Sequence, residues 1–243
     1  MLIVSVGMQK SGSAYIYNII NDLNIAAGYP DARVVKEKHK LDDVMQWRNN
    51  NVGKMERKLL RQLVGISKKE GQFVIKTHDG PTFTLRWMNR FGKTATIYIY
   101  RDPRDVLISA ADHGKKILAE GKNHTFAGMV DFNAGFNNVK QWVGLWEEYS
   151  KLDNVLKVKY EDLMSAPSKE IGRIMKHIGI TLPADKVQEI LHRYDKNNSE
   201  ANMLGLHFNK GISERYKNEL TEEQLLRFKN ELGDSMRKMG YEV

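Results

Sequence analysis

The apolar and polar positions along the chain alternate between strand-like and helix-like patterns. Four short runs rich in apolar residues predict strands of the kind that a parallel sheet buries. These runs are LIVSV (Leu2 to Val6), FVIKTH (Phe73 to His78), TATIYIYR (Thr94 to Arg101) and NVLKVKYED (Asn154 to Asp162). Longer segments separate them, so we expect other elements between the strands.

Helix-like spacing appears between and after the predicted strands. It is found in AYIYNIINDL (Ala14 to Leu23) and in FNNVKQWVGLWEEYSK (Phe136 to Lys151), where apolar residues recur every three or four positions. PSKEIGRIMKHIGI (Pro167 to Ile180) starts with proline, which suits the first position of a helix. Alternating strands and helices predict an α/β fold: a single domain over residues 1–243 with a central parallel sheet flanked by helices. Ligands of such folds bind beyond the carboxyl ends of the strands.

Composition narrows the class of protein and of partner. A chain of 243 residues is long enough for one well-buried domain, and 41% hydrophobic residues favour a folded globule over a disordered segment. The formal charge of +8 favours a polyanionic partner, which could be nucleic acid, an anionic membrane surface or a small, multiply phosphorylated ligand. The absence of cysteine excludes disulfides, thiolate metal sites and a cysteine nucleophile.

The sequence has no segment typical of membrane insertion. No apolar run approaches the length of a transmembrane helix, and MLIVSVGM at the start is too short for the apolar part of a signal peptide. We therefore expect a soluble, cytoplasmic protein without a membrane span.

The first candidate for chemistry is the loop after the first predicted strand, within VGMQKSGSAYIY. Gly7 and Gly12 bracket four residues, as in a phosphate-binding loop, but the lysine is Lys10, inside the loop, and does not follow the second glycine directly. Glycines let backbone amides approach an anion, and Lys10 with the hydroxyls of Ser11 and Ser13 would complete an anion site at a helix N-terminus. Taken alone, an ordinary turn with an exposed lysine is the commoner interpretation.

The second candidate is YIYRDPRDVLISAADH (Tyr98 to His113). The predicted strand ends at Arg101, the next two residues break it, and the helix that follows could present Ser109 on the side from which Arg101 reaches. Arginine binds a phosphate as a bidentate fork, and serine adds a neutral donor. The alternative is a surface network of arginine and aspartate.

The third candidate is KTHDGP (Lys76 to Pro81), at the end of a predicted strand. Alternation along a strand points Lys76 and His78 to the same face. Histidine can take a proton from a hydroxyl nucleophile, and lysine can stabilise negative charge on a leaving oxygen. The histidines that we assign to structural or surface roles are His39, His113, His124, His177, His192 and His207.

In this order and spacing, the three segments resemble those of the nucleotide-dependent sulfotransferases. QKSGSAY is similar to the PKSGTTW loop for the 5'-phosphosulfate, RDPRDVLIS to the RNPKDVLVS segment for the 3'-phosphate, and KTH to the acceptor-site lysine and histidine. KYEDLMSAP (Lys159 to Pro167) resembles the YEDL segment, NKGISERYKNELT (Asn209 to Thr221) resembles RKGxxGDWKNxFT, and MRKMGY matches the usual ending. The resemblance covers nearly the whole chain and implies a P-loop, nucleotide-kinase-like fold.

The resemblance also implies a reaction and a set of site residues. A sulfuryl group would move in line from 3'-phosphoadenosine 5'-phosphosulfate (PAPS) to a hydroxyl acceptor, without a metal, leaving adenosine 3',5'-bisphosphate (PAP). Lys10, Lys76 and His78 are then catalytic, with His78 as the base, and most of the catalysis comes from positioning and charge stabilisation. The nucleotide would be bound by Lys10, Ser11, Gly12, Ser13, Ala14, Tyr15, Arg101, Ser109, Tyr160, Ser199, Lys210 and Gly211. Among these, Arg101 and Ser109 hold the 3'-phosphate and Tyr15 stacks on adenine.

Several positions depart from the family pattern. Asn209 stands where arginine is expected, which predicts a weaker 3'-phosphate site, and Ser199 is the alignable residue of the shortened adenine-side segment. ELTEEQ lacks the valine of the family's dimerisation stretch, so the oligomeric state stays open. The chain also starts almost at its first strand, without the leading segment of the animal cytosolic enzymes, so we expect a compact, bacterial-type or viral relative.

The acceptor is the least determined partner. By resemblance, His78 favours a small-molecule or glycan hydroxyl acceptor. We expect the walls of the acceptor site to come from Tyr29 to Gly71 and from Asp112 to Phe136. The segment His113 to His124 is expected to be a mobile lid or an ordinary exposed connection.

Three other functions remain open. A P-loop kinase for small molecules shares the strand, loop and helix, but it predicts lysine directly after Gly12, where Ser13 stands, and a magnesium site. A non-catalytic module for RNA or anionic lipid is supported by net charge alone. A degenerate sulfotransferase that binds nucleotide without transfer is possible because of Asn209.

Overall fold

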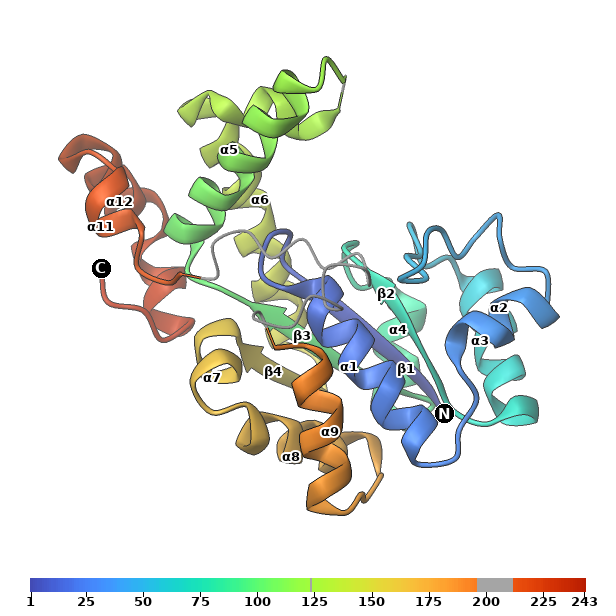
Figure 1. Ribbon diagram of the computed structural model, residues 1–243. Coiled ribbons are helices and arrows are strands. Elements are labelled where there is room, and N and C mark those ends of the chain that lie inside the picture. The colour runs from blue at the N-terminus through green and yellow to red at the C-terminus, as the bar shows by residue number, and fades with distance from the viewer. Residues whose placement is uncertain (123, 196–211) are drawn as a thin grey trace.

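The computed structural model describes residues 1–122, 124–195 and 212–243. In this part of the chain the four predicted strands form one parallel sheet in the order β2-β1-β3-β4. The strands are β1 (Leu2–Gly7), β2 (Phe73–Thr77), β3 (Thr94–Tyr100) and β4 (Val155–Lys159). Every residue of β1 and β2 is buried, as their nearly unbroken apolar runs require. The predicted α/β fold with a central parallel sheet is confirmed (Figure 1).

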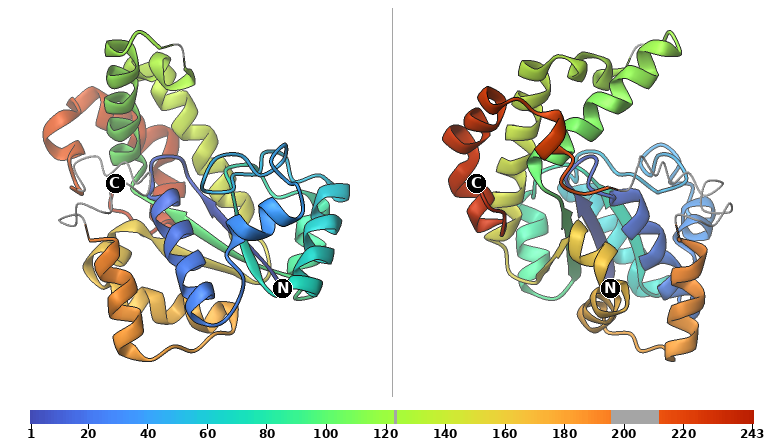
Figure 2. Two further views of the ribbon diagram at one scale, coloured as in Figure 1. Left: turned by 45° about the vertical axis from the view of Figure 1, so that its right-hand side comes forward. Right: turned by 60° about the vertical axis from the view of Figure 1, so that its left-hand side comes forward.

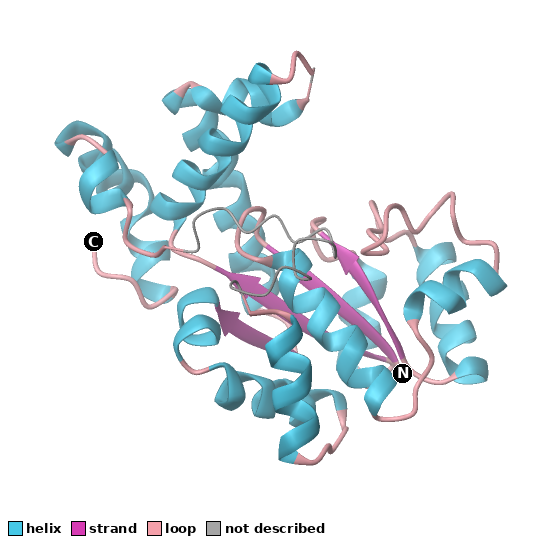
Figure 3. Ribbon diagram, viewed as in Figure 1, coloured by secondary structure: helices cyan, strands magenta, loops and turns pink. Residues whose placement is uncertain are grey.

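Helices cover both faces of the sheet (Figures 1 and 3). One face carries α1 (Ser13–Ala26), α8 (Pro167–Ile178) and α9 (Ala184–Arg193), and the other carries α4 (Phe83–Arg90) and α6 (Phe132–Ser150). Helices α2 (Ala32–Lys38) and α3 (Arg57–Glu70) lie near β2, and α7 (Tyr160–Ser165) follows β4. Beyond β3 lie α5 (Pro103–Ala119) and the 3-10 helix η1 (Thr125–Val130). Near α5 and α6 lie α11 (Tyr216–Glu219) and α12 (Glu222–Lys238) (Figure 2). Within the described residues, each helix is too short or too polar to cross a lipid bilayer.

The helical spacing of the sequence corresponds to the packing of α6. Val139, Trp142, Val143 and Trp146 are all buried and belong to one hydrophobic cluster with the strands. Burying an aliphatic or aromatic side chain of this size contributes about 1.5–3 kcal/mol, so this face fixes the helix on the sheet.

The strand order places a crevice between β1 and β3. The chain runs from β1 to β2 on one side and then crosses back over β1 to β3 on the other. At such a reversal the connections leave in opposite directions, and ligands bind outside the carboxyl ends of the two strands. The loop after β1 and the start of α5 both lie at this point. Asp102 caps α5 by accepting a hydrogen bond from the Arg104 amide, and Pro103 occupies the first turn, as the predicted break requires.

The strand predicted for Asn154 to Asp162 is too long at its carboxyl end. It ends at Lys159, because Tyr160 begins α7. Glu161 and Asp162 then fall in the first turn of that helix, where acidic side chains are stabilised by the helix dipole.

The segment His113 to His124 is also more regular than predicted, because α5 continues through it to Ala119. Within this part of α5, Gly114 lies where η1 packs against the helix. A Cβ at Gly114 would lie 2.3 Å from the carbonyl oxygen of Phe126, so only glycine fits there. Gly114 therefore permits a close contact between α5 and η1.

Candidate active site

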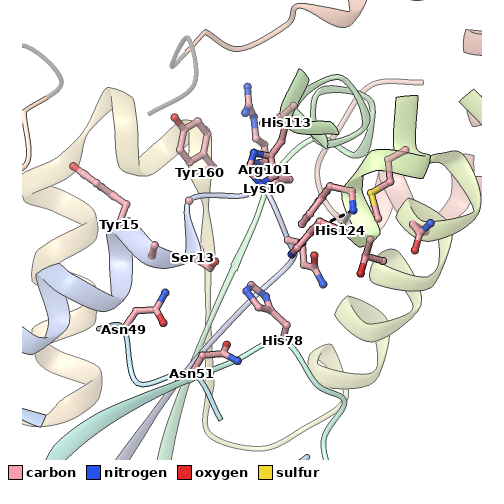
Figure 4. Close-up of a pocket in the computed structure, with 18 of the residues that line it drawn as sticks. Lys10, Ser13, Tyr15, Asn49, Asn51, His78, Arg101, His113, His124 and Tyr160 are labelled. Atoms are coloured by element: carbon pink, nitrogen blue, oxygen red, sulfur yellow. Dashed lines mark hydrogen bonds between the residues drawn. The ribbon is translucent and has the colours of Figure 1, made fainter. Parts of the chain in front are cut away.

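A cavity of about 660 Å³ opens at the carboxyl ends of the strands (Figure 4). The residues that follow the four strands all reach it: Lys10 after β1, His78 after β2, Arg101 after β3 and Tyr160 after β4. The three predicted segments converge here because the carboxyl ends of neighbouring parallel strands meet at one edge of the sheet. The rest of the wall comes from the start of α1, the segment 47–51, and α5 with η1.

The loop between β1 and α1 is shaped for the close approach of an anion. Gly12 has a φ of +84° and lies against Tyr160, where a Cβ would come within 3.0 Å of the ring. Lys10 also has a positive φ, 64°, so the backbone turns sharply at both positions. α1 starts at Ser13 with no side-chain cap and no acidic residue in its first turn. The positive end of its dipole is therefore not neutralised by its own first turn.

The predicted contacts at the start of α1 separate into two groups. Residues 13–15 line the cavity, and the Tyr15 ring packs edge-on against Tyr194 with the ring centroids 6.1 Å apart. Ser11 is fully buried instead, and its hydroxyl lies within hydrogen-bond distance of the carbonyl oxygens of Met8 and Ile99. The structure thus directs this hydroxyl away from the cavity and uses it to brace the loop against β3.

Lys10 is a partly desolvated cation at the cavity wall. Burial and the nearby charge of Lys116 lower the pKa of Lys10 to about 8, although Asp112 acts in the opposite direction. Its Nζ lies 5.5 Å from the centroid of the Phe126 ring. Because burial disfavours the charged form, an anion bound beside Lys10 would stabilise the ammonium.

Arg101 is held from three sides and keeps one donor unpaired. Its Nη2 donates to Asp105 (3.2 Å) and to the carbonyl oxygen of Ile212 (2.6 Å), and its guanidinium carbon lies 4.8 Å from the centroid of the Tyr160 ring. Its Nε is buried and has no hydrogen-bond partner among the described residues. A buried donor without a partner costs about 1–3 kcal/mol, so an acceptor at this position would be stabilising. Ser109 lines the cavity together with Arg101, as predicted.

Lys76 and His78 are in contact with each other, which confirms that they point to the same face. Lys76 Nζ lies 2.6 Å from His78 Nε2, and His78 Nδ1 lies 2.7 Å from the Gly7 carbonyl oxygen. Because a carbonyl can only accept, Nδ1 carries the proton and Nε2 is the accepting nitrogen. Burial, followed by the charge of Lys76, lowers the pKa of His78 to about 3, so the imidazole is neutral at physiological pH.

The two members of this pair differ in their access to the cavity. His78 lines it, whereas Lys76 is 3% exposed and lies behind, with Nζ 3.4 Å from the side-chain oxygen of Asn51. Burial lowers the pKa of Lys76 to about 7. This lysine therefore changes charge close to neutral pH.

Aromatic and imidazole rings that were not among the predicted site residues form a wall beside Lys10. His124 stacks on Phe126 with an angle of 4° between the rings, and His113 meets Phe126 edge-on at 5.0 Å. All three line the cavity, so His113 and His124, which were expected in structural or surface roles, lie at the candidate site. The only signal was that these histidines flank a lysine-rich segment within one of the predicted acceptor walls.

A second missed group lies in the segment 47–51. Trp47, Asn49 and Asn51 line the cavity because backbone hydrogen bonds hold this irregular segment beside β2. The Val52 amide donates to the Lys76 carbonyl oxygen (2.7 Å), and the Lys76 amide donates to the Asn50 carbonyl oxygen (3.1 Å). Both stretches expected to supply acceptor walls, Tyr29 to Gly71 and Asp112 to Phe136, do contribute to this cavity.

The predicted nucleotide contacts Ser199, Lys210 and Gly211 lie outside the described residues, as does Asn209. Their roles stay predictions. Within the described residues, no group of three or more histidine, aspartate or glutamate side chains is arranged to hold a metal ion. A reaction without metal also stays a prediction.

Comparison with known proteins identifies the family. The sulfotransferase domain family matches residues 2–240. The chain belongs to this family. Similar curated proteins include sulfotransferase 1A1 of Canis lupus familiaris, 28% identical over 190 residues (69% of this chain, 63% of the relative), and luciferin sulfotransferase of Photinus pyralis, 28% identical over 184 residues (65% and 49%). The matches thus span about 63% and 49% of the length of these two relatives.

Solved structures of sulfotransferases share the fold. Mouse sulfotransferase SULT7A1 complexed with PAP has a TM-score of 0.61 at 19% identity, over 97% of this chain and 84% of that chain. Retinol dehydratase in a complex with retinol and PAP has a TM-score of 0.62 at 20% identity, over 100% and 83%. The predicted sulfotransferase fold is therefore confirmed.

Proposed function

We propose that this protein transfers a sulfuryl group from PAPS to a hydroxyl group of a small-molecule or glycan acceptor. One observation carries the proposal: a single cavity holds an uncapped helix N-terminus with Lys10, a buried arginine with an unpaired Nε, and a neutral histidine of fixed tautomer. Family membership and the PAP named in the similar structures support it.

The residues present fit a nucleotide with phosphates at both the 3' and 5' positions. Arg101 and Ser109 would hold the 3'-phosphate, which would supply the missing acceptor for Arg101 Nε. Lys10 and the start of α1 would hold the 5' group, and Tyr15 would flank the adenine. When bound, the nucleotide supplies an activated sulfuryl group. A cavity of about 660 Å³ is in the usual range for such ligands.

His78 is the group proposed to take the proton from the acceptor hydroxyl. Its Nδ1–H is fixed on the Gly7 carbonyl oxygen, so Nε2 is the nitrogen that can accept, but Lys76 lies against it at 2.6 Å. A hydroxyl reaches Nε2 only when Lys76 moves aside. The same movement removes a like charge, which raises the pKa of His78 and makes it a stronger base. Lys76 would then stabilise negative charge on the transferring group.

The acceptor half of the cavity is proposed to lie between His78 and the rings of Trp47 and Phe126. Met129 and Asn51 line the same cavity, so apolar side chains and a few polar groups would both be available to an acceptor. The retinol named in one similar structure is an apolar alcohol, which supports a small hydroxyl acceptor here.

Calorimetric titration with PAP, AMP and ATP with magnesium tests the nucleotide site. We expect tight, metal-independent binding of PAP, and weaker binding of AMP because AMP lacks the 3'-phosphate that Arg101 would pair with. Equal affinity for AMP and PAP would argue against the site, and magnesium-dependent binding of ATP alone would favour a kinase.

Two variants separate binding from transfer. Arg101→Ala should weaken PAP binding by about 2–3 kcal/mol, since it removes a charge-assisted contact with the 3'-phosphate. His78→Ala should abolish transfer and leave PAP affinity nearly unchanged, because the base acts on the acceptor. Arg237→Ala, at an exposed ion pair with Asp234, is the matched control and should change neither. Full activity of His78→Ala would rule out the histidine base.

A further inference from the structure

The outer face of α4 carries three exposed aromatic side chains in a row. Phe83, Trp87 and Phe91 are spaced four residues apart and are 83%, 50% and 56% exposed. The rings of Trp87 and Phe91 lie 4.8 Å apart. Leu85 and Met88, on the opposite side, are buried and hold the helix on the core. The exposed rings are therefore not needed for packing, and such a group on a surface marks an interaction site.

Basic residues surround these rings. Arg90 lies two helical turns after Phe83, on the same face of α4, and Lys93 follows the helix; both are exposed. α3 contacts α4 and lies beside it (Figures 1 and 2). The exposed basic residues of α3 are Arg57, Lys58, Arg61, Lys68 and Lys69.

Acidic residues are scarce in this region. From residue 56 to residue 93 the acidic residues are Glu56, Glu70 and Asp79, and Glu148 of α6 pairs with Arg86 of α4 (3.2 Å). Glu70 is already paired with Lys38 (2.6 Å) and His39 (3.0 Å), so it does not neutralise the cations of α3. The surface of α3 and α4 is thus a row of aromatic rings with an excess of basic over acidic residues beside it.

We propose that the α3–α4 surface binds an anionic lipid bilayer. Phenylalanine and tryptophan enter the headgroup region of a bilayer, and lysine and arginine around them attract anionic lipid. A second copy of the chain is a poorer partner for this surface, because two faces of the same positive charge would repel each other. Single-stranded nucleic acid is also a poorer partner, because it binds in a basic groove that follows its backbone, whereas the faces of helices are convex.

This surface is separate from the cavity. None of its aromatic or basic residues lines the cavity, so the proposal does not depend on the proposed reaction. Variants of the surface should therefore keep the far-UV circular dichroism and the thermal unfolding of the parent protein, which tests that they are folded.

The test is co-sedimentation of the full chain with lipid vesicles. The protein should sediment with vesicles in which a third of the lipid is phosphatidylglycerol, should not sediment with pure phosphatidylcholine, and should be released by high salt. Phe83→Ser/Trp87→Ser should weaken vesicle binding at least about tenfold, because it removes the apolar contact. Arg57→Glu/Arg61→Glu should also weaken it at least about tenfold, because each cation near an anionic surface contributes about fivefold.

Matched controls lie on α12. Leu226→Ser removes a side chain that is 55% exposed, and Lys229→Glu/Lys238→Glu makes the same change in net charge as the α3 variant. Both controls should retain vesicle binding. The proposal is overturned if phosphatidylglycerol gives no preference, if the controls lose binding equally, or if the α4 variant abolishes only a dimer or an RNA complex.

Discussion

Lys76 and His78 place two basic groups in contact at a buried position, and their pKa values separate their roles. Burial lowers the pKa of Lys76 to about 7, whereas the pKa of His78 falls to about 3. Near neutral pH, therefore, only Lys76 changes its charge. If the ammonium form of Lys76 assists transfer, kcat/KM should fall as pH rises through about 7, since that form is lost. The measurement is kcat/KM from about pH 5.5 to 9, which reports the free enzyme.

Lys76→Met provides the comparison, because it removes the titrating amine and keeps the length of the side chain. Its kcat/KM should be lower and flat near pH 7. The pKa of His78, followed by NMR, should rise, since the like charge beside it is gone. A decline near pH 7 that persists in this variant would assign the titration to another group.

Individual residues of the candidate site could be predicted where a chemically reactive or charged side chain directly follows a predicted strand. Lys10, Arg101 and His78 each follow an apolar run, so their convergence follows from a parallel sheet. The direction of the Ser11 hydroxyl could not be predicted, because it depends on the turn of the loop backbone. His124 lies in a segment without periodicity, and its position depends on how η1 packs.

At the level of elements, Asp105 connects α5 to the C-terminal segment. It is 1% exposed, and its carboxylate accepts hydrogen bonds from Arg101 Nη2 (3.2 Å) and from the amides of Glu214 (2.8 Å) and Tyr216 (3.2 Å). Asp105→Asn removes the charge that pairs with Arg101 and replaces one accepting oxygen by a donor. We expect a loss of about 3 kcal/mol in the free energy of unfolding, because a buried charge loses its partner.

Hydrogen exchange distinguishes this role from a general loss of stability. The amides of residues 214 and 216 should lose protection first in Asp105→Asn, while those of β1 keep theirs. Glu120→Gln, at the C-cap of the same helix, is the control; its partner is the exposed Lys122, so stability should stay nearly unchanged. Unchanged protection at residues 214 and 216 would show that the carboxylate does not anchor the segment.

Elements were predictable where one signal dominated the local sequence. The strands and α1, α6 and α8 follow from apolar runs and from helical spacing. The end of β4 and the full length of α5 could not be predicted in this way, because both depend on contacts between distant residues. At Gly114 the missing side chain serves the packing of η1, and no local pattern distinguishes that role from a chain break.

At the scale of the whole molecule, the sequence predicts the sheet, its parallel direction and the edge at which ligands bind. It could not predict which irregular segments close the cavity. The segment 47–51 reaches the cavity through backbone hydrogen bonds to β2, and η1 reaches it through α5. Such contacts join residues far apart in the chain and carry no periodic signal, so these lining residues were predicted only within two long stretches.

The net charge of +8 gives a final prediction for the whole molecule. A doubly phosphorylated nucleotide should be steered toward a cavity lined by Lys10 and Arg101, so its association rate should depend strongly on salt. Between about 0.01 and 1 M salt the Debye length falls from about 30 to 3 Å, and we expect association of PAP to slow at least about tenfold. Dissociation should change by less than about twofold, since the proposed contacts with the nucleotide would be short and partly buried. Stopped-flow fluorescence can follow both rates through Trp47 at the cavity wall. Salt dependence confined to dissociation would mean that the charges act only after contact.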